Sequence, residues 1–128
     1  MTEKDLCAEA IILSGVEPKK CMRCGKCSGA CPSYEEMEYH PHEFVYMIEK
    51  GQFNKLSQSQ SLYKCLSCFV CVERCPKNVM PANIIEAVKS LTIRKRDADR
   101  HSTDEIPSFS DENTPQQLLM AAMRKYSK

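Results

Sequence analysis

The first clear pattern of apolar and polar positions covers residues 3–14. Its apolar residues recur every three or four positions, as one face of a helix requires. Thr2 can cap the start of this helix, and Gly15 stands where a helix usually ends. We therefore predict an amphipathic helix over these residues. The residues expected on its apolar face are Leu6, Ala10, Ile11 and Leu13.

Two more helices are predicted at residues 41–50 and 82–95. The first has Pro41 in its first turn and Gly51 just past its end, which favours a helix between them. The second has the most regular apolar spacing in the chain, and basic residues at its end suit the helix dipole. These basic residues are Arg94, Lys95 and Arg96. The apolar stripes are Phe44, Val45 and Ile48 in the first helix and Ile84, Ile85, Val88 and Leu91 in the second.

The segments between these helices carry weaker patterns. Residues 33–39 predict a short helical turn, and residues 52–61 predict a polar loop or the start of a helix. Leu62 and Tyr63 are expected to return to the core. No segment reads as a good alternating strand, so the fold class is expected to be mainly α.

The composition changes near the C-terminal end of the chain. Residues 1–96 are expected to form one domain, and residues 97–113 are polar and predict a flexible linker. Residues 114–128 then predict a tethered helix, which would pack either on its own domain or on a partner. Its expected start signals are Thr114 as the cap, Pro115 at the first helical position and Gln117 in a capping box. Its expected apolar face comprises Leu118, Leu119, Ala122, Met123 and Tyr126.

Composition leaves the core in need of another stabilising element. Leu, Ile, Val and Phe make up 25 of 128 residues, about 20%, which is at the lower edge for a globular domain. Chains with so few large apolar residues usually need a disulfide or a metal. The nine cysteines are the obvious candidates.

Net charge and hydropathy exclude several kinds of partner. The chain has 18 basic and 17 acidic side chains, a net charge of +1, so no general positive field would attract nucleic acid. The longest apolar run, residues 44–48, has five residues and cannot span a membrane. The first residues carry no long apolar stretch of the kind found in secretory signals. We therefore expect a cytoplasmic protein with no direct membrane span and no nucleic-acid partner.

Eight of the nine cysteines form two identical sets. Each set has the spacing C-x2-C-x2-C-x3-C-P, and each cysteine of the second set lies 44 positions after its counterpart. The sets are Cys21, Cys24, Cys27 and Cys31, followed by Pro32, and Cys65, Cys68, Cys71 and Cys75, followed by Pro76. The residues between the sets show no similar echo, so we expect a repeat of ligands rather than of folds.

Three kinds of chemistry use cysteines in such numbers. Disulfides would need an oxidising compartment, and the sequence offers no export signal. Structural zinc uses C-x2-C pairs, for which the third equally spaced cysteine is surplus. The third kind is iron–sulfur chemistry, because this run is the bacterial ferredoxin-type signature of a [4Fe–4S] cluster. The two runs therefore predict two [4Fe–4S] clusters as cofactors.

In this signature the fourth cysteine of each run binds the other cluster. Three cysteines on a tight loop hold three corners of one cluster, and the proline after the fourth keeps the chain extended. The predicted ligands are Cys21, Cys24, Cys27 and Cys75 for one cluster and Cys65, Cys68, Cys71 and Cys31 for the other. Such crossing ties the two halves of the chain together, so folding should be linked to cluster insertion.

Other residues near the runs have simpler interpretations. Cys7 lies on the predicted first helix and is interpreted as a small buried residue. His40 and His42 are interpreted as structural or surface residues, since the cysteines already fill every ligand position. Phe69 and Val70 make the second loop more apolar, which predicts a drier second cluster. The basic residues of the first loop form either a solvated rim or a collar that offsets cluster charge or meets an acidic partner. They are Lys19, Lys20, Arg23 and Lys26.

The residues inside the two runs are as informative as their spacing. The first run reads CMRCGKCSGACP from Cys21, and the second reads KCLSCFVCVERCP from Lys64, followed by KNVMP. Over residues 3–95 these strings make the chain resemble the C subunit of heterodisulfide reductase. The resemblance implies an α-helical ferredoxin, in which helices rather than β-hairpins frame two cubane-binding loops.

The resemblance also implies a role in electron transfer. In that family the C subunit passes single electrons to a cysteine-rich B subunit, and a flavin-containing A subunit often supplies them. We see no phosphate loop, no nucleophile with a base and no open metal site in the chain, so a non-catalytic role is expected. The alternatives are an iron–sulfur subunit of another flavin-dependent oxidoreductase of the glycolate oxidase or fumarate reductase type, a free ferredoxin, or a non-redox metal-stapled binding module.

Overall fold

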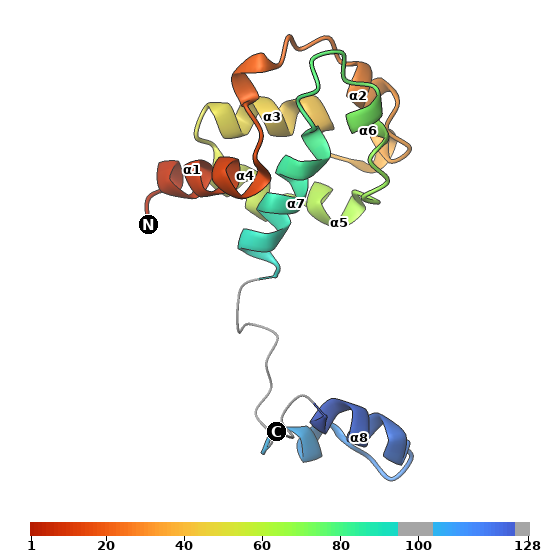
Figure 1. The fold of residues 1–128 in the computed structure, drawn as a ribbon. Helices are drawn as coiled ribbons and strands as arrows, with labels where there is room; N and C mark the ends of the chain where they lie inside the picture. The colour runs from red at the N-terminus through yellow and green to blue at the C-terminus, as the bar shows by residue number, and fades with distance from the viewer. Residues whose placement is uncertain (95–103, 125–128) are drawn as a thin grey trace. The chain divides into compact units, whose positions relative to one another are not determined.

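The computed structural model describes residues 1–94 and 104–124 and divides the chain into two compact units. The first unit spans Met1–Lys95 and the second Arg96–Lys128. All regular structure in the described residues is helical, which confirms the mainly α, ferredoxin-like fold class (Figure 1). Among these residues, no helix has the length and apolarity needed to cross a membrane. The helices of the first unit, including two 3₁₀ turns, are α1 Glu3–Ser14, η1 Pro18–Lys20, α2 Lys26–Gly29, η2 Tyr34–Glu36, α3 Pro41–Glu49, α4 Phe53–Gln58, α5 Ser61–Lys64, α6 Val70–Glu73 and α7 Pro81–Thr92.

Helix α1 has the predicted boundaries but a different buried face. The Thr2 hydroxyl accepts a hydrogen bond from the backbone N–H of Asp5, and the Asp5 carboxylate accepts one from the Thr2 N–H. The buried residues are Cys7 and Ala10, whereas Leu13 is 56% exposed, so its predicted place in the core is wrong. Helix α1 packs against α4 and α7, and small residues on the contact face let helices approach closely.

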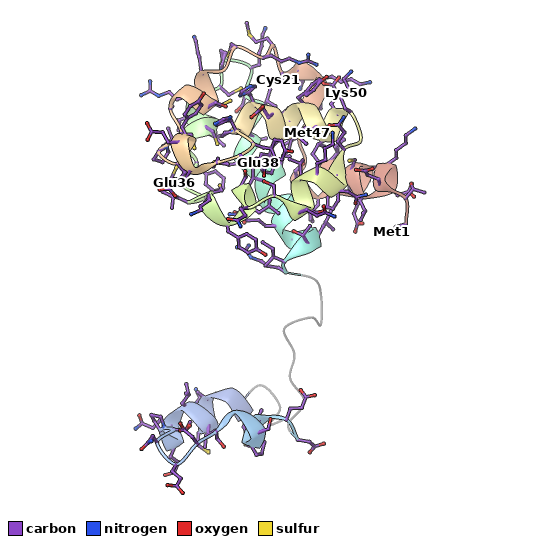
Figure 2. All side chains as sticks on the ribbon, turned by 180° about the vertical axis from the view of Figure 1, so that it is seen from behind. Met1, Cys21, Glu36, Glu38, Met47 and Lys50 are labelled. Carbon is purple, nitrogen blue, oxygen red and sulfur yellow. The ribbon has the colours of Figure 1, made fainter. Side chains whose placement is uncertain are left out.

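Helices α3 and α7 supply most of the core. Every residue of the predicted stripe of α3 is at most 1% exposed, as are the first three of α7. Leu91 is only partly buried, and α7 ends at Thr92, earlier than predicted. Figure 2 shows Met47 of α3 among the packed side chains and the exposed Met1 at the outside. The fully buried apolar residues of the two stripes are Phe44, Val45, Ile48, Ile84, Ile85 and Val88.

The segment before the second cysteine run is more ordered than the sequence indicates. Helix α4 forms where a polar loop or helix start was expected, because Phe53 and Leu56 are buried at 3% and 0% exposure. Leu62 is buried as predicted, but Tyr63 is 71% exposed and does not return to the core. Helix α5 is a single turn that buries Ser61 and Leu62, which leaves Tyr63 on its solvent-facing side.

The 44-residue repeat is a repeat of backbone structure as well as of cysteines. Helices α2 and α6 begin 44 positions apart, lie side by side in Figure 1 and contact each other. The residue before each helix is left-handed, Gly25 with φ +76° and Phe69 with φ +62°. Cys21 and Cys65, which open the runs, have nearly equal backbone angles. The repeat therefore extends from the cysteines to the backbone of the two short loops, because the cysteine spacing repeats the loop geometry even where other side chains differ.

The second unit contains η3, Ile106–Phe109, and α8, Gln116–Met123. The predicted cap is wrong: Thr114 exchanges hydrogen bonds with Asp111, and no side chain caps α8. Leu118 and Met123 of the expected apolar face are exposed, and Leu119 is partly exposed. Of the other predictions, those on residues 97–103 of the linker, Lys95, Arg96, the side chain of Ala122 and Tyr126 lie outside the described residues.

Candidate metal centre

The eight repeated cysteines line two cavities in the first unit. One, here called the first cavity, is lined by Cys21, Cys24 and Cys27 of the first run together with Cys75 of the second. The second cavity is lined by Cys65, Cys68 and Cys71 together with Cys31 of the first run. Each fourth cysteine thus lies with the three cysteines of the other run.

The electrostatic neighbours of Cys31 and Cys27 follow the same grouping. Burial raises the pKa of Cys31, and the thiols of Cys65 and Cys68 in the other run raise it further. Burial likewise raises the pKa of Cys27, with added effects from Cys21 and Cys75.

The two cavities approach each other at their buried cysteines. Burial raises the pKa of Cys71 to about 11, and the thiols that add to this effect are Cys65, Cys27 and Cys68. Cys27 and Cys71 form a small buried cluster with Ala82. The buried thiols of both cavities therefore lie near the contact between α2 and α6.

Backbone N–H groups point at the sulfur atoms of both cavities. The Val79 N–H donates to the sulfur of Cys75 at 3.3 Å. Backbone hydrogen bonds from Ser33 and from Ala82 lower the pKa values of Cys31 and Cys71 against the larger effect of burial. The Ala82 N–H belongs to the first turn of α7, where backbone donors have no partner within the helix. These donors favour thiolate over thiol.

The donor sets fit [4Fe–4S] clusters. Soft thiolates are the usual ligands of such clusters, and N–H donors to their sulfur atoms are part of how proteins bind and tune them. All nine cysteines are free thiols, and within residues 1–94 and 104–124 no three Cys, His, Asp or Glu side chains converge on one ion position. In each cavity four thiols instead surround a space.

The rims of the two loops differ in chemistry but not in cysteine burial. Each cysteine of the second loop has the same burial class as its counterpart in the first, with Cys24 and Cys68 exposed. Leu66 and Phe69 are 68% and 44% exposed, and both line the second cavity together with Val70. The lining of the second cavity is richer in apolar residues than that of the first, which carries Arg23, His42 and Lys77, and a drier second cluster stays a prediction.

The basic residues of the first loop are all exposed. Lys20 pairs with Glu17 at 3.1 Å, and Arg23 lies over the Tyr46 ring and 3.9 Å from Glu49. Exposed pairs of this kind contribute little to stability. The described contacts thus fit the interpretation as a solvated rim for at least two of the four residues.

Cys7 and the two histidines have the structural roles expected of them. Cys7 lies on the buried face of α1, is 3% exposed and lines neither cavity. His40 bonds to Glu43, and His42 Nδ1 lies 2.5 Å from the Ser28 hydroxyl beside the first cavity. The prediction for Cys7 as a small buried residue is confirmed.

A network of three polar residues at the second cavity was not predicted from the sequence. Ser67, Glu86 and Lys89 form a hydrogen-bonded network between the second loop and α7. The available signal was a pair of charges at positions 86 and 89, on the same helical face as Ala82 and Ile85. Charged residues on a helix face that also carries buried residues usually have specific partners.

The segment that carries both cysteine runs matches a known family of iron–sulfur domains. Residues 17–79 match the model of the 4Fe–4S dicluster domain, a stretch that includes all eight repeated cysteines. The chain is similar to the C subunit of heterodisulfide reductase. It matches the C2 subunit of the H2/formate-dependent CoB–CoM heterodisulfide and ferredoxin reductase of Methanococcus maripaludis with 32% identity over 77 residues, 60% of this chain and 41% of that protein.

Other relatives of the same type match over similar lengths. The iron–sulfur C subunit of the CoB–CoM heterodisulfide reductase of Methanopyrus kandleri is 31% identical over 75 residues, 59% of this chain and 39% of that protein. The C subunit of the ferredoxin-dependent CoB–CoM heterodisulfide reductase of Methanosarcina mazei is 29% identical over 82 residues, 64% of this chain and 50% of that protein. The match thus covers only two fifths to one half of these curated relatives. The similarity to these relatives and to the dicluster domain supports [4Fe–4S] clusters as the cofactor and electron transfer as the role.

Proposed function

We propose that the chain is an electron relay of the heterodisulfide reductase C type, with two [4Fe–4S] clusters. The chemistry that such clusters supply when bound is reversible one-electron transfer. The first cluster would be held by Cys21, Cys24, Cys27 and Cys75, and the second by Cys65, Cys68, Cys71 and Cys31. The observation that carries the proposal is that thiols of both runs line each cavity.

The arrangement of the thiols favours clusters over zinc. A structural zinc ion draws four ligands to about 2.3 Å from one point, whereas a cubane binds one thiolate at each of four corners. Four thiols that surround a space, with backbone donors aimed at their sulfur atoms, suit the second arrangement. The chain's own residues would bind the cluster, hold it in a fixed position and stabilise its negative charge.

Metal and sulfide analysis tests this proposal. Anaerobically purified protein is expected to contain about eight iron and eight sulfide per chain, because each cubane carries four of each. Reduction with dithionite should then produce a paramagnetic signal, which separates a redox relay from a purely structural metal site. Two zinc ions and no sulfide, or clusters that accept no electron, would contradict the proposal.

The partner is proposed to be a cysteine-rich, B-like subunit, with a flavin-containing, A-like subunit as the electron source. The support is that each relative is named as one subunit of a heterodisulfide reductase. Fixed stoichiometry with such a partner during purification would distinguish a dedicated relay from a freely diffusing ferredoxin.

Truncation after Arg100 tests a role for α8 in partner binding. The apolar residues Leu118 and Met120 of α8 are 61% and 65% exposed, an amount of apolar surface that favours contact with another protein. We expect the truncated chain to keep its full iron content but to bind the partner at least tenfold more weakly, as measured by calorimetry. Loss of iron would instead show that the helix belongs to the cluster domain, and unchanged affinity would rule out a docking role.

A further inference from the structure

One face of α7 follows the second cysteine loop along the helix. Ala82, Ile85, Glu86 and Lys89 occupy positions i, i+3, i+4 and i+7, which lie on the same side of a helix. Ala82 and Ile85 line the second cavity, and the two charged residues bond to the loop itself. The helix therefore contacts this site both with its first turn and with its C-terminal half.

Lys89 is a buried cation whose donors are fully used. Its side chain is only 8% exposed. The ammonium group donates to Glu86 Oε1 at 2.9 Å, to the Ser67 hydroxyl at 3.0 Å and to the carbonyl oxygen of Cys65 at 3.3 Å. A lysine has three such donors, so each has one partner. Burying a charge is costly unless it is paired. A buried lysine whose three donors all have partners therefore indicates a specific role for its charge.

The network holds a strained part of the loop. Ser67 lies between Cys65 and Cys68 and has φ +52°, in the left-handed region that serine rarely adopts. Such a conformation persists only where the surroundings hold it. The Ser67 hydroxyl donates to Glu86 and accepts from Lys89, which fixes this residue to α7. Burial opposes the ionisation of Glu86, but the hydrogen bonds that its carboxylate accepts from Ser67 and Lys89, and the positive charges of Lys89 and Arg94, keep the pKa of this carboxyl below the usual value.

The corresponding position of the first loop carries an exposed cation instead of a contact with a buried one. The counterpart of Ser67 there is Arg23, also left-handed with φ +55°. Its side chain is 53% exposed and packs on Tyr46, with Glu49 3.9 Å away. Water screens an exposed charge far more than a buried one. The two loops therefore share a backbone but differ in how strongly a fixed positive charge acts on them.

We propose that Lys89 is a positioning residue of the second cluster, which clamps the loop between Cys65 and Cys68 and raises the reduction potential of that cluster by its buried charge. The proposal rests on the assignment of a cluster to the second cavity. Reduction adds one electron from an external reductant, takes the core from 2+ to 1+ and takes core plus four thiolates from −2 to −3, with no proton required. A fixed positive charge nearby stabilises the more negative, reduced form.

Substitutions of opposite sign test this electrostatic role. Lys89→Met removes the positive charge and should make reduction of the second cluster about tenfold less favourable, or 59 mV for one electron. Glu86→Gln removes the negative charge at nearly constant shape and should shift the potential upward. The measurement is a dithionite titration of the whole chain followed by electron paramagnetic resonance. The signal of the second cluster is identified as the one that is lost in Cys68→Ser.

The test has two controls, an exposed lysine near the same loop and the potential of the first cluster. Lys64→Met removes a 44% exposed lysine next to Cys65, paired with Glu36 at 3.6 Å, and should leave the potential almost unchanged. The potential of the first cluster serves as an internal reference and should not move. Equal shifts in Lys64→Met and Lys89→Met, or shifts of the same sign in Lys89→Met and Glu86→Gln, overturn the proposal.

The electrostatic role can be tested even if Lys89→Met fails to assemble the second cluster. If Lys89→Met loses the second cluster, an upward shift in Glu86→Gln still supports the electrostatic role, and no shift overturns it. A wild-type chain without a second cluster would overturn the proposed function itself, and with it this inference. An unshifted second cluster in both variants, at full iron content, would overturn only the inference.

Discussion

Replacing Cys75 by serine is expected to remove the cluster of the first loop and to leave that of the second. Iron should fall from about eight to about four per chain, since one cubane of four iron atoms is lost. The reason is that Cys75 lies in the first cavity with the three cysteines of the other run. Cys31→Ser should have the converse effect, because Cys31 lies in the second cavity.

Spectral matching makes this result specific to the crossed arrangement. The remaining spectrum of Cys75→Ser should coincide with that of Cys24→Ser, and the spectrum of Cys31→Ser with that of Cys68→Ser. Cys7→Ser is the matched control, because it changes a 3% exposed cysteine that lines neither cavity and should leave iron unchanged. If Cys75→Ser instead matches Cys68→Ser, each run binds its own cluster and the crossing is wrong.

Removal of iron and sulfide should destabilise the first unit about as much as the most damaging single core substitutions. Helices α2 and α6 have four residues each, too few to be stable without tertiary support. Structural metal sites contribute folding free energy directly, and a loss of about 3–5 kcal/mol would lower the unfolding midpoint by about 12–40 °C. Anaerobic thermal unfolding followed by circular dichroism, before and after chelation, measures the difference.

Reconstitution provides the control for this measurement. Adding iron and sulfide back under reducing conditions should restore the midpoint, which excludes irreversible damage as the cause. Limited proteolysis of the metal-free chain should cut first near the two loops, whereas the contact of α3 with α7 persists longest because its residues are fully buried. A metal-free chain that unfolds within a few degrees of the loaded protein would show that the helical core is sufficient by itself.

Local interactions explain why parts of this fold could be predicted from the sequence. Apolar spacing identified α1, α3 and α7, because helix formation depends on neighbours three and four residues apart. Predictions failed where packing between distant segments decided the outcome. Leu13 fits the helical stripe of α1 but is exposed, since the side of α1 that meets α4 and α7 carries Cys7 and Ala10. Helix α4 and the outward position of Tyr63 likewise depend on what packs against them.

The sequence by itself determined the candidate ligands and their chemistry. Two runs with the same spacing and the same following proline indicate thiolate ligands of iron–sulfur clusters, because such spacing reflects the geometry of one loop around one cube. The cysteine spacing also revealed the 44-residue repeat. That the backbone of α2 repeats in α6 could not be predicted, because the other side chains of the two loops differ.

Only the tertiary structure decided what surrounds these ligands. The direction of α7 brings Glu86 and Lys89 to a loop about 20 residues earlier, and no local pattern states which partner a helical charge will meet. The burial of Lys89 follows from that contact, because its charge is tolerated only where the Cys65 carbonyl, Ser67 and Glu86 accept its hydrogen bonds. Long-range contacts of this kind depend on the whole fold, whereas the cysteine spacing depends on one short loop.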